Sequence, residues 1–234
     1  MIATVRNPKR AGRSNGCLEP LEDGERLAAS EFLRRYQAMP HLKKAELIEG
    51  VVYMGSPVSF HNHAAPDGLV QTWLGTYAAN TPGTQAGGNG TTRLDIDNVS
   101  QPDAVLRIME ECGGASRLDE GGYLVGAPEL VVEISASSAS IDLHAKLHVY
   151  RRNGVKEYLT WRTVDQEFDW RVLVEGEYRP MKPDAEGVLQ SRVFPGLWLS
   201  VKSLLGRDGS AVLATLGTGL RSRAHKSFVA QLAV

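Results

Sequence analysis

The sequence has few of the features that mark several large classes of protein. Its two cysteines in 234 residues, Cys17 and Cys112, are too few for a disulfide framework or a zinc knuckle, and this fits a reducing compartment. No apolar run reaches the length of a membrane span, and the first ten residues lack the apolar core of a signal peptide. We therefore expect a cytoplasmic protein without a membrane segment.

Charge of one sign and aromatic side chains are also scarce. The formal net charge is −1, so any binding of nucleic acid must depend on local basic patches. Aromatic residues make up 7% of the chain and are not interleaved with basic ones, which argues against a stacking platform for single strands. The chain has no Gly-x-Ser-x-Gly motif, and the glycines at 87–90 match no phosphate-binding loop.

The length and composition favour one globular domain between two tails. With 42% hydrophobic and 23% charged residues, a chain of 234 residues can bury one sizeable core. We predict a mobile N-terminal tail over residues 1–27, because this segment is basic, polar and aperiodic. The folded domain is expected over residues 28–206, followed by a C-terminal tail, 207–234, that could contain one short helix.

The first half of the domain shows alternating strand and helix signals. A short helix is expected from its cap at Ser30, and residues 45–54 are typical of two strands that turn near Gly50. Apolar residues at helical spacing predict a helix from about Pro66 to Asn80. Strands are expected over 92–96 and 103–109.

The second half predicts a strand–helix–strand unit. The apolar run Glu129–Ile134 is typical of a strand buried on both faces. A helix capped by Ser140, with an apolar stripe of Leu143, Leu147 and Tyr150, should connect it to a strand over 155–161. Because such crossovers join parallel strands, the sheet should be at least partly parallel. A hairpin over 168–181 should lie at its periphery.

Two acidic residues stand inside or beside buried runs. Glu133 interrupts the apolar strand, and Asp103 begins the run that follows Pro102. An unpaired carboxylate in such a place costs several kcal/mol or raises its own pKa, so each one needs a cation, a metal or convergent donors. Two acids at strand ends favour a divalent metal.

Four other groups of residues leave alternatives open. Lys146 lies beside the buried helical stripe and could point toward Glu133, or it could form a surface pair with Asp142 four residues earlier. Glu49 could be a metal ligand or a strand-edge residue that faces water. His61 and His63 precede a helix and could belong to an active site, whereas His144 and His148 are better explained as surface histidines than as zinc ligands.

Taken together, these motifs resemble the Uma2 family of putative restriction endonucleases, within the PD-(D/E)XK nuclease superfamily. The resemblance covers about residues 28–206. It rests on the order of a set of short motifs: Glu46–Gly50, His61, Pro102-Asp103, Ala127–Ser135, Asp142, Lys146, Tyr150 and Gly154–Tyr158.

The resemblance implies an α/β fold with a restriction-endonuclease-like mixed central sheet flanked by helices. It also implies Mg²⁺ or Mn²⁺ as cofactor and DNA as the substrate whose phosphodiester bonds are hydrolysed; a homodimer is left open. Asp103, Glu133 and Glu49 correspond to the metal-binding acids, Lys146 to the catalytic lysine and His61 to a histidine common in the family. The alternative is a binding module that keeps the nuclease fold without catalysis.

Overall fold

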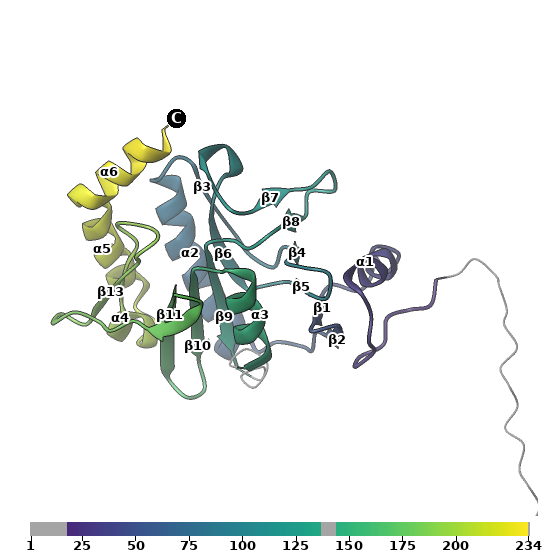
Figure 1. Cartoon of the computed structure of the whole chain (residues 1–234). Coiled ribbons are helices and arrows are strands. Elements are labelled where there is room, and N and C mark those ends of the chain that lie inside the picture. Colours follow the sequence, from purple (N-terminus) through teal and green to yellow (C-terminus); the bar gives the residue numbers. More distant parts are fainter. Residues whose placement is uncertain (1–17, 137–143, 234) are drawn as a thin grey trace, which may run out of the picture.

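The computed structural model describes residues 18–136 and 144–233, which form two six-stranded sheets, a two-stranded pair and their covering helices (Figure 1). The larger sheet is mixed, in the order β12-β11-β10-β9-β6-β3. Its strands have these bounds: β3 Thr84–Gly87, β6 Ala104–Ile108, β9 Leu130–Ser135, β10 Glu157–Arg162, β11 Glu167–Val174 and β12 Glu177–Pro180.

The predicted strand–helix–strand unit forms the centre of this sheet. β9 and β10 are parallel, and α3 (Lys146–Asn153) connects them. Every residue of β9 is buried, because α3 covers one face of the strand and a second layer of helices covers the other. β11 and β12 form the predicted hairpin at the sheet edge. The predicted cap Ser140 and the residue Leu143 lie outside the described residues.

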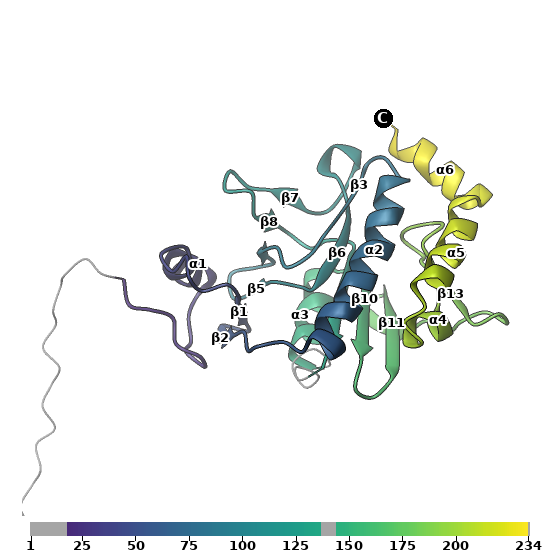
Figure 2. The same cartoon turned by 180° about the vertical axis from the view of Figure 1, so that it is seen from behind.

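Helix α2 (Ala65–Ala79) covers the second face of the larger sheet, which Figure 2 shows from behind. Pro66 lies in its first turn, where its missing N–H costs nothing, and the buried residues Val70, Trp73, Leu74 and Tyr77 recur at helical spacing. Together with Leu130, Val132 and Ile134 they belong to the largest apolar cluster.

A smaller sheet lies beside the larger one, in the order β2-β1-β5-β4-β8-β7. α1 (Ala29–Gln37) packs on its first strands through Phe32, which is fully buried with Leu47 and Val52. The 3-10 turn Glu110–Cys112 precedes β7. The strand bounds are β1 Ala45–Ile48, β2 Val51–Met54, β4 Thr92–Arg93, β5 Val99–Ser100, β7 Arg117–Leu118 and β8 Leu124–Val125.

The C-terminal region is folded onto the core, unlike the tail expected for residues 207–234. α5 (Gly209–Leu220) buries Val212 and Leu216 in the largest apolar cluster, and α6 (Arg223–Leu232) follows it. α4 (Val201–Leu205) and the pair β13 (Val188–Gln190) and β14 (Trp198–Ser200) precede them. Gly217 and Gly219 lie inside α5 and weaken its helical signal in the sequence.

Other differences are local. The cap of α1 is Ala28, without a side-chain hydrogen bond, so Ser30 lies inside the helix. The strand expected over 92–96 is reduced to β4, because Asp95 turns the chain by accepting from the N–H of Asp97 and from Asn98. Residues 18–27 also contact the domain, since Leu21 is buried against α1 and β1.

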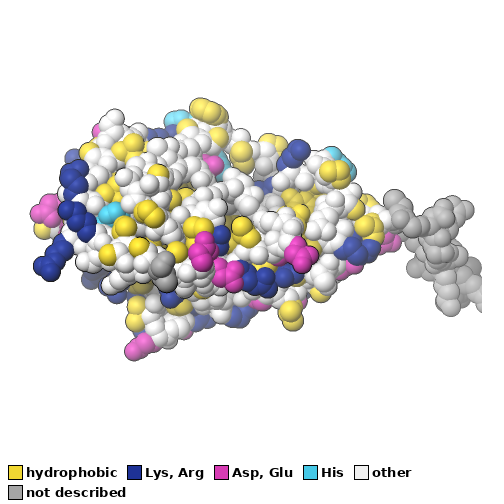
Figure 3. Space-filling view, turned by 90° about the horizontal axis from the view of Figure 1, so that it is seen from above, with side chains coloured by type: hydrophobic (Ala, Val, Ile, Leu, Met, Phe, Trp, Pro, Cys, Tyr) yellow, Lys and Arg dark blue, Asp and Glu magenta, His cyan; other side chains and the backbone are white. Residues whose placement is uncertain are grey.

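The described surface has mixed charge. On the face that Figure 3 shows, basic and acidic side chains lie next to one another and form no field of one sign. Among the described residues, no helix has the length and apolar character that crossing a membrane requires.

Candidate active site

Asp103 and Glu133 face each other across two neighbouring strands. β6 and β9 are antiparallel with Ala104 opposite Val132, so the register places Asp103 opposite Glu133 at the carboxyl end of β9. Both are almost fully buried, with 3% and 2% of their surface exposed. The N–H of Ile134 donates to Asp103 Oδ2 at 2.8 Å, which ties the first acid to the strand that carries the second.

Glu133 is bound by two side chains of α3. Lys146 Nζ lies 3.0 Å from Glu133 Oε1, and the Tyr150 hydroxyl donates to the same oxygen at 2.8 Å. Lys146 is the first residue of the helix and Tyr150 lies one turn later, so both point to the sheet. Burial, and then the charge of Glu133, raise the pKa of Tyr150, which keeps its hydroxyl protonated as a donor.

Lys146 also pairs with a third acid, Glu46. Its Nζ atom lies 2.9 Å from Glu46 Oε2, and Glu46 Oε1 accepts from the N–H of Gln101 at 2.7 Å. Glu46 stands in β1, where all four residues are buried. One ammonium group is therefore shared between a carboxylate of each sheet.

Asp103 has two partners of its own, a lysine and a histidine. Lys44 Nζ lies 3.1 Å from Oδ1, and His63 Nε2 lies 3.3 Å from Oδ2. Burial alone would raise the pKa of Asp103, but the His63 hydrogen bond and the Lys44 charge outweigh it and hold the pKa well below its usual range. The bond to Asp103 raises the pKa of His63 in turn, against the effect of burial.

These six side chains line one cavity of about 220 Å³, namely Lys44, Glu46, His63, Asp103, Glu133 and Lys146. The end of β2 and the segment after it form the remaining wall, with Tyr53, Met54, Gly55, Ser56 and Val58. The six come from five separate parts of the chain, so the tertiary structure alone brings them together. Three carboxylates, two ammonium groups and an imidazole around one opening form a site suited to binding a cation or to acid–base chemistry.

Residues 29–202 match the model of the Uma2 family, which is described as putative restriction endonuclease. The chain belongs to the Uma2 family. This assignment supports a nuclease function in general. A search of curated proteins found no significant match.

One solved structure supports the fold of this Uma2 member. It is the crystal structure of a putative nuclease belonging to DUF820 from Anabaena variabilis, with a TM-score of 0.56 and 16% sequence identity. The alignment covers 74% of this chain and 97% of that chain. The likeness confirms the expected nuclease-type α/β fold, and at this identity it shows the fold alone.

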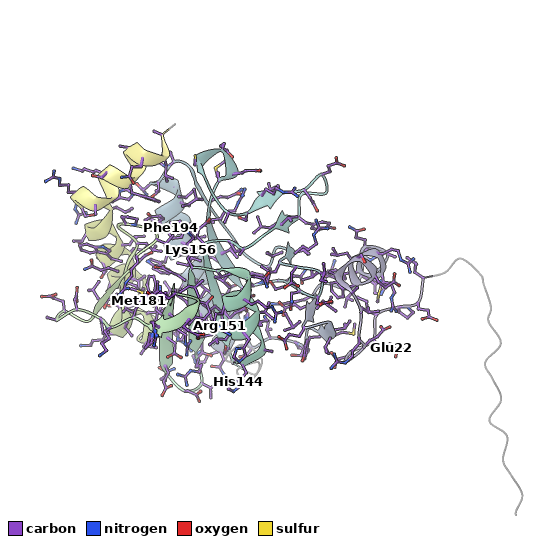
Figure 4. The ribbon with its side chains drawn as sticks, viewed as in Figure 1. Glu22, His144, Arg151, Lys156, Met181 and Phe194 are labelled. Carbon is purple, nitrogen blue, oxygen red and sulfur yellow. The ribbon has the colours of Figure 1, made fainter. Side chains whose placement is uncertain are left out.

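The structure brings three of the five predicted site residues of this Uma2 protein together: Asp103, Glu133 and Lys146. The alternative of a solvated Asp142–Lys146 pair does not fit Lys146, whose side chain is 5% exposed; Asp142 itself lies outside the described residues. His144, which precedes α3, and His148, on the helix, are both exposed, as expected. Figure 4 labels His144 just before the start of α3 and Arg151 further along the helix.

The structure does not place Glu49 in the cavity, and Glu46 is there instead. Glu49 and Gly50 form the two-residue turn between β1 and β2, both with positive φ (52° and 72°), so Glu49 points outward and pairs with Arg152 at 3.2 Å. The signal that indicated Glu133, an acid inside an apolar run, also applies to Glu46 between Ala45 and Leu47 and could have found it.

The structure likewise separates the two histidines. His61 is exposed, and Arg207 holds it through its backbone carbonyl at 2.8 Å, whereas His63 contacts Asp103. Both belong to a π-helical turn, Phe60–Ala64, that precedes α2. His63 lies three residues before Pro66 and seven before Val70, in phase with the buried face of α2, and this spacing could have distinguished it from His61.

Proposed function

We propose that this Uma2 protein is a metal-dependent endonuclease that hydrolyses phosphodiester bonds in DNA. The observation that carries the proposal is the pairing of Asp103 and Glu133 across β6 and β9 in a cavity that also contains Lys146. Burying an acid costs folding free energy, and here Asp103, Glu133 and Glu46 all line the same cavity. The family assignment supports the same reaction class.

The donor chemistry of the cavity fits a divalent metal. Asp103, Glu133 and the neighbouring Glu46 offer the carboxylate oxygens that Mg²⁺ and Mn²⁺ bind. In the described residues, no three His, Cys, Asp or Glu side chains are yet close enough to form a ready metal site; Lys44 and Lys146 approach the acids instead. A bound metal would polarise a phosphate and lower the pKa of a bound water.

The protein's own side chains provide positioning and charge. Lys146 is fixed between Glu46 and Glu133, at the distance needed to orient a water beside Glu133 or to stabilise negative charge on a phosphate. Lys44 keeps about a third of its side chain exposed, so it can also attract a phosphate to the opening. His63 holds a proton against Asp103 at the same wall.

A binding module that keeps the fold without catalysis is the second candidate. The observation that favours it is the close charge compensation in the cavity, where Asp103 and Glu133 each have an ammonium group within about 3 Å. In that case the ion pairs would stabilise the fold, and the cavity would bind a ligand without cutting it.

The deciding experiment incubates the protein with supercoiled plasmid and with single-stranded DNA, in Mg²⁺, Mn²⁺ or EDTA. We expect cleavage with the metals, none with EDTA, and Mn²⁺ binding by calorimetry that is lost in Asp103→Asn and in Glu133→Gln. DNA binding without cleavage in any metal would favour the binding module. Cleavage that survives both EDTA and the two substitutions would overturn the assignment of this cavity.

A further inference from the structure

An apolar group of side chains lies beside the candidate active site. Of the six large apolar side chains that are exposed in the described part of the chain, Val58, Phe60 and Val164 belong to two segments at the carboxyl end of β9 and β10. Thr163 Oγ1 donates to the carbonyl of Asn62 at 2.6 Å and joins these two segments. We call Val58, Phe60 and Val164 the apolar rim.

Phe60 is the most prominent member of the apolar rim. It is 79% exposed, and in the sequence it lies between Val58 and His63, which both line the cavity. Its segment is held in place from two sides, because Arg207 donates to the carbonyl of His61 and Thr163 to that of Asn62. An aromatic ring that is exposed to water on a segment fixed in this way costs hydration free energy and marks a surface suited to binding a partner.

We propose that the apolar rim receives an unpaired DNA base, which stacks on Phe60 while the neighbouring phosphate enters the cavity. The substrate is then single-stranded DNA or DNA with unpaired bases next to the cleaved bond. The inference rests on the proposed function. The sequence predicts the opposite, since its aromatic residues are sparse and not interleaved with basic ones. A single ring beside the cavity is nevertheless enough to stack one base.

Three observations favour a base over other partners. Val58 belongs both to the rim and to the cavity wall, and Phe60 follows it by two residues, so a nucleotide held in the cavity can reach the ring. A stable protein dimer needs roughly 800 Å² from each partner, which three side chains do not supply. The net charge of −1 also limits what phosphate contacts contribute, and stacking on an aromatic ring is the usual supplement in proteins that bind single strands.

The test compares Phe60→Ala with Phe60→Trp and with Ile96→Ala. Ile96 is a matched control, because it is also 79% exposed but lines a different groove, next to α1. Binding of a labelled single-stranded oligonucleotide and of its blunt duplex is measured by anisotropy with Ca²⁺. We expect Phe60→Ala to weaken single-strand binding about tenfold or more, Phe60→Trp to preserve it, and Ile96→Ala to change neither substrate.

A fluorescent base analogue reports stacking directly. An oligonucleotide containing 2-aminopurine should lose fluorescence on binding to the wild type and keep it with Phe60→Leu, which is apolar but has no ring.

Equal losses of single-strand and duplex affinity in Phe60→Ala, or unchanged quenching in Phe60→Leu, would overturn the stacking proposal while metal-dependent cleavage stands. A dimer that Phe60→Ala dissociates would assign the rim to a second copy and also overturn it. A wild type that binds no DNA overturns this inference and the proposed function together.

Discussion

The two ends of strand β9 hold buried acids in opposite ways. Glu129 and Glu133 are four residues apart on the same face and are 3% and 2% exposed. Glu129 accepts the backbone N–H groups of Ile108 and Ala115 at 2.8 Å each. Glu133 instead pairs with Lys146 and lines a cavity. Two acids of equal burial therefore have different surroundings: Glu129 fixes the backbone of two neighbouring segments, and Glu133 lines a cavity.

The neighbouring acids repeat this contrast. Glu157, beside the Glu129 end in β10, accepts from Ser191, Trp170 and two backbone N–H groups, and burial raises its pKa despite these bonds. Asp103, beside Glu133, has a lowered pKa because His63 and Lys44 outweigh burial. Burial of an acid therefore does not by itself indicate function. The decisive properties are the charge of its partners and its access to a cavity.

The largest expected effect is on cleavage. Glu133→Gln should lower the rate by at least about 10³-fold, roughly 4 kcal/mol, because it removes one of the carboxylates proposed to bind the metal. The matched variant Glu129→Gln changes the equally buried acid that directly precedes β9, and it should cleave at the wild-type rate per folded molecule. Plasmid nicking with Mn²⁺ measures both. Similar rates in the two variants would remove the distinction between the two ends of β9.

The next effect concerns the shared lysine. Lys146→Met should cost about 3 kcal/mol of unfolding free energy in urea, because Glu46 and Glu133 then share a buried site without their common cation. Adding Glu46→Gln should recover a large part of this loss, while cleavage stays about a hundredfold below the wild type. A double variant as unstable as Lys146→Met would show that the pairing with Glu46 contributes little.

At the Glu129 end of β9, a substitution should lower the stability of the fold and leave metal binding unchanged. Glu129→Ala leaves two backbone N–H groups without their acceptor, which should cost about 2 kcal/mol. Thermal melting and Mn²⁺ calorimetry together check this. We expect a lower melting temperature with unchanged metal binding, and a loss of metal binding would mean that the two ends are coupled.

A smaller effect depends on pH. His63 has a raised pKa in the folded protein, so its bond to Asp103 stabilises fully below the ordinary His pKa of 6.5 and is lost as the pH rises through the higher folded value. Asp103 has a lowered pKa, so its contribution is present above 3.8 and is lost as the pH falls toward the folded value. Wild type and His63→Gln should therefore differ most between about pH 4 and 6.5.

That difference should be on the order of 0.5–1 kcal/mol, since His63 is partly exposed and the pair is screened. Urea titrations at pH 5 and pH 9 measure it. A gap between wild type and His63→Gln that is the same at both pH values would assign the role of His63 to packing and not to its charge.

The smallest effects are expected at the two residues that the structure moves away from the cavity. Glu49→Ala and His61→Ala should each change unfolding free energy by less than about 0.5 kcal/mol and leave cleavage within twofold, because both side chains are exposed. Glu46→Gln and His63→Gln, assayed beside them, should lose activity. The opposite result would restore the assignments made from the sequence.

The sequence alone determined the local structure and part of the site. Apolar runs and helical spacing were enough for β9, α2, α3, the β11–β12 hairpin and the parallel pair, because burial imposes these periods on any chain. The same logic indicated Asp103 and Glu133, since an acid inside an apolar run must have a partner. The family resemblance placed Lys146 beside them, and the helical stripe was consistent with it.

Only the tertiary structure decided which neighbours complete the cavity. Whether Glu46 or Glu49 points inward depends on the turn at Glu49-Gly50, and His63 takes its place through the π-helical turn. For residues 207–234 the sequence indicated a tail with one short helix at most, because α5 gains stability from packing on the core and not from a strong pattern of its own. Local periodicity fixes the face on which a side chain lies, whereas the register between distant segments, which depends on the whole core, determines what that face meets.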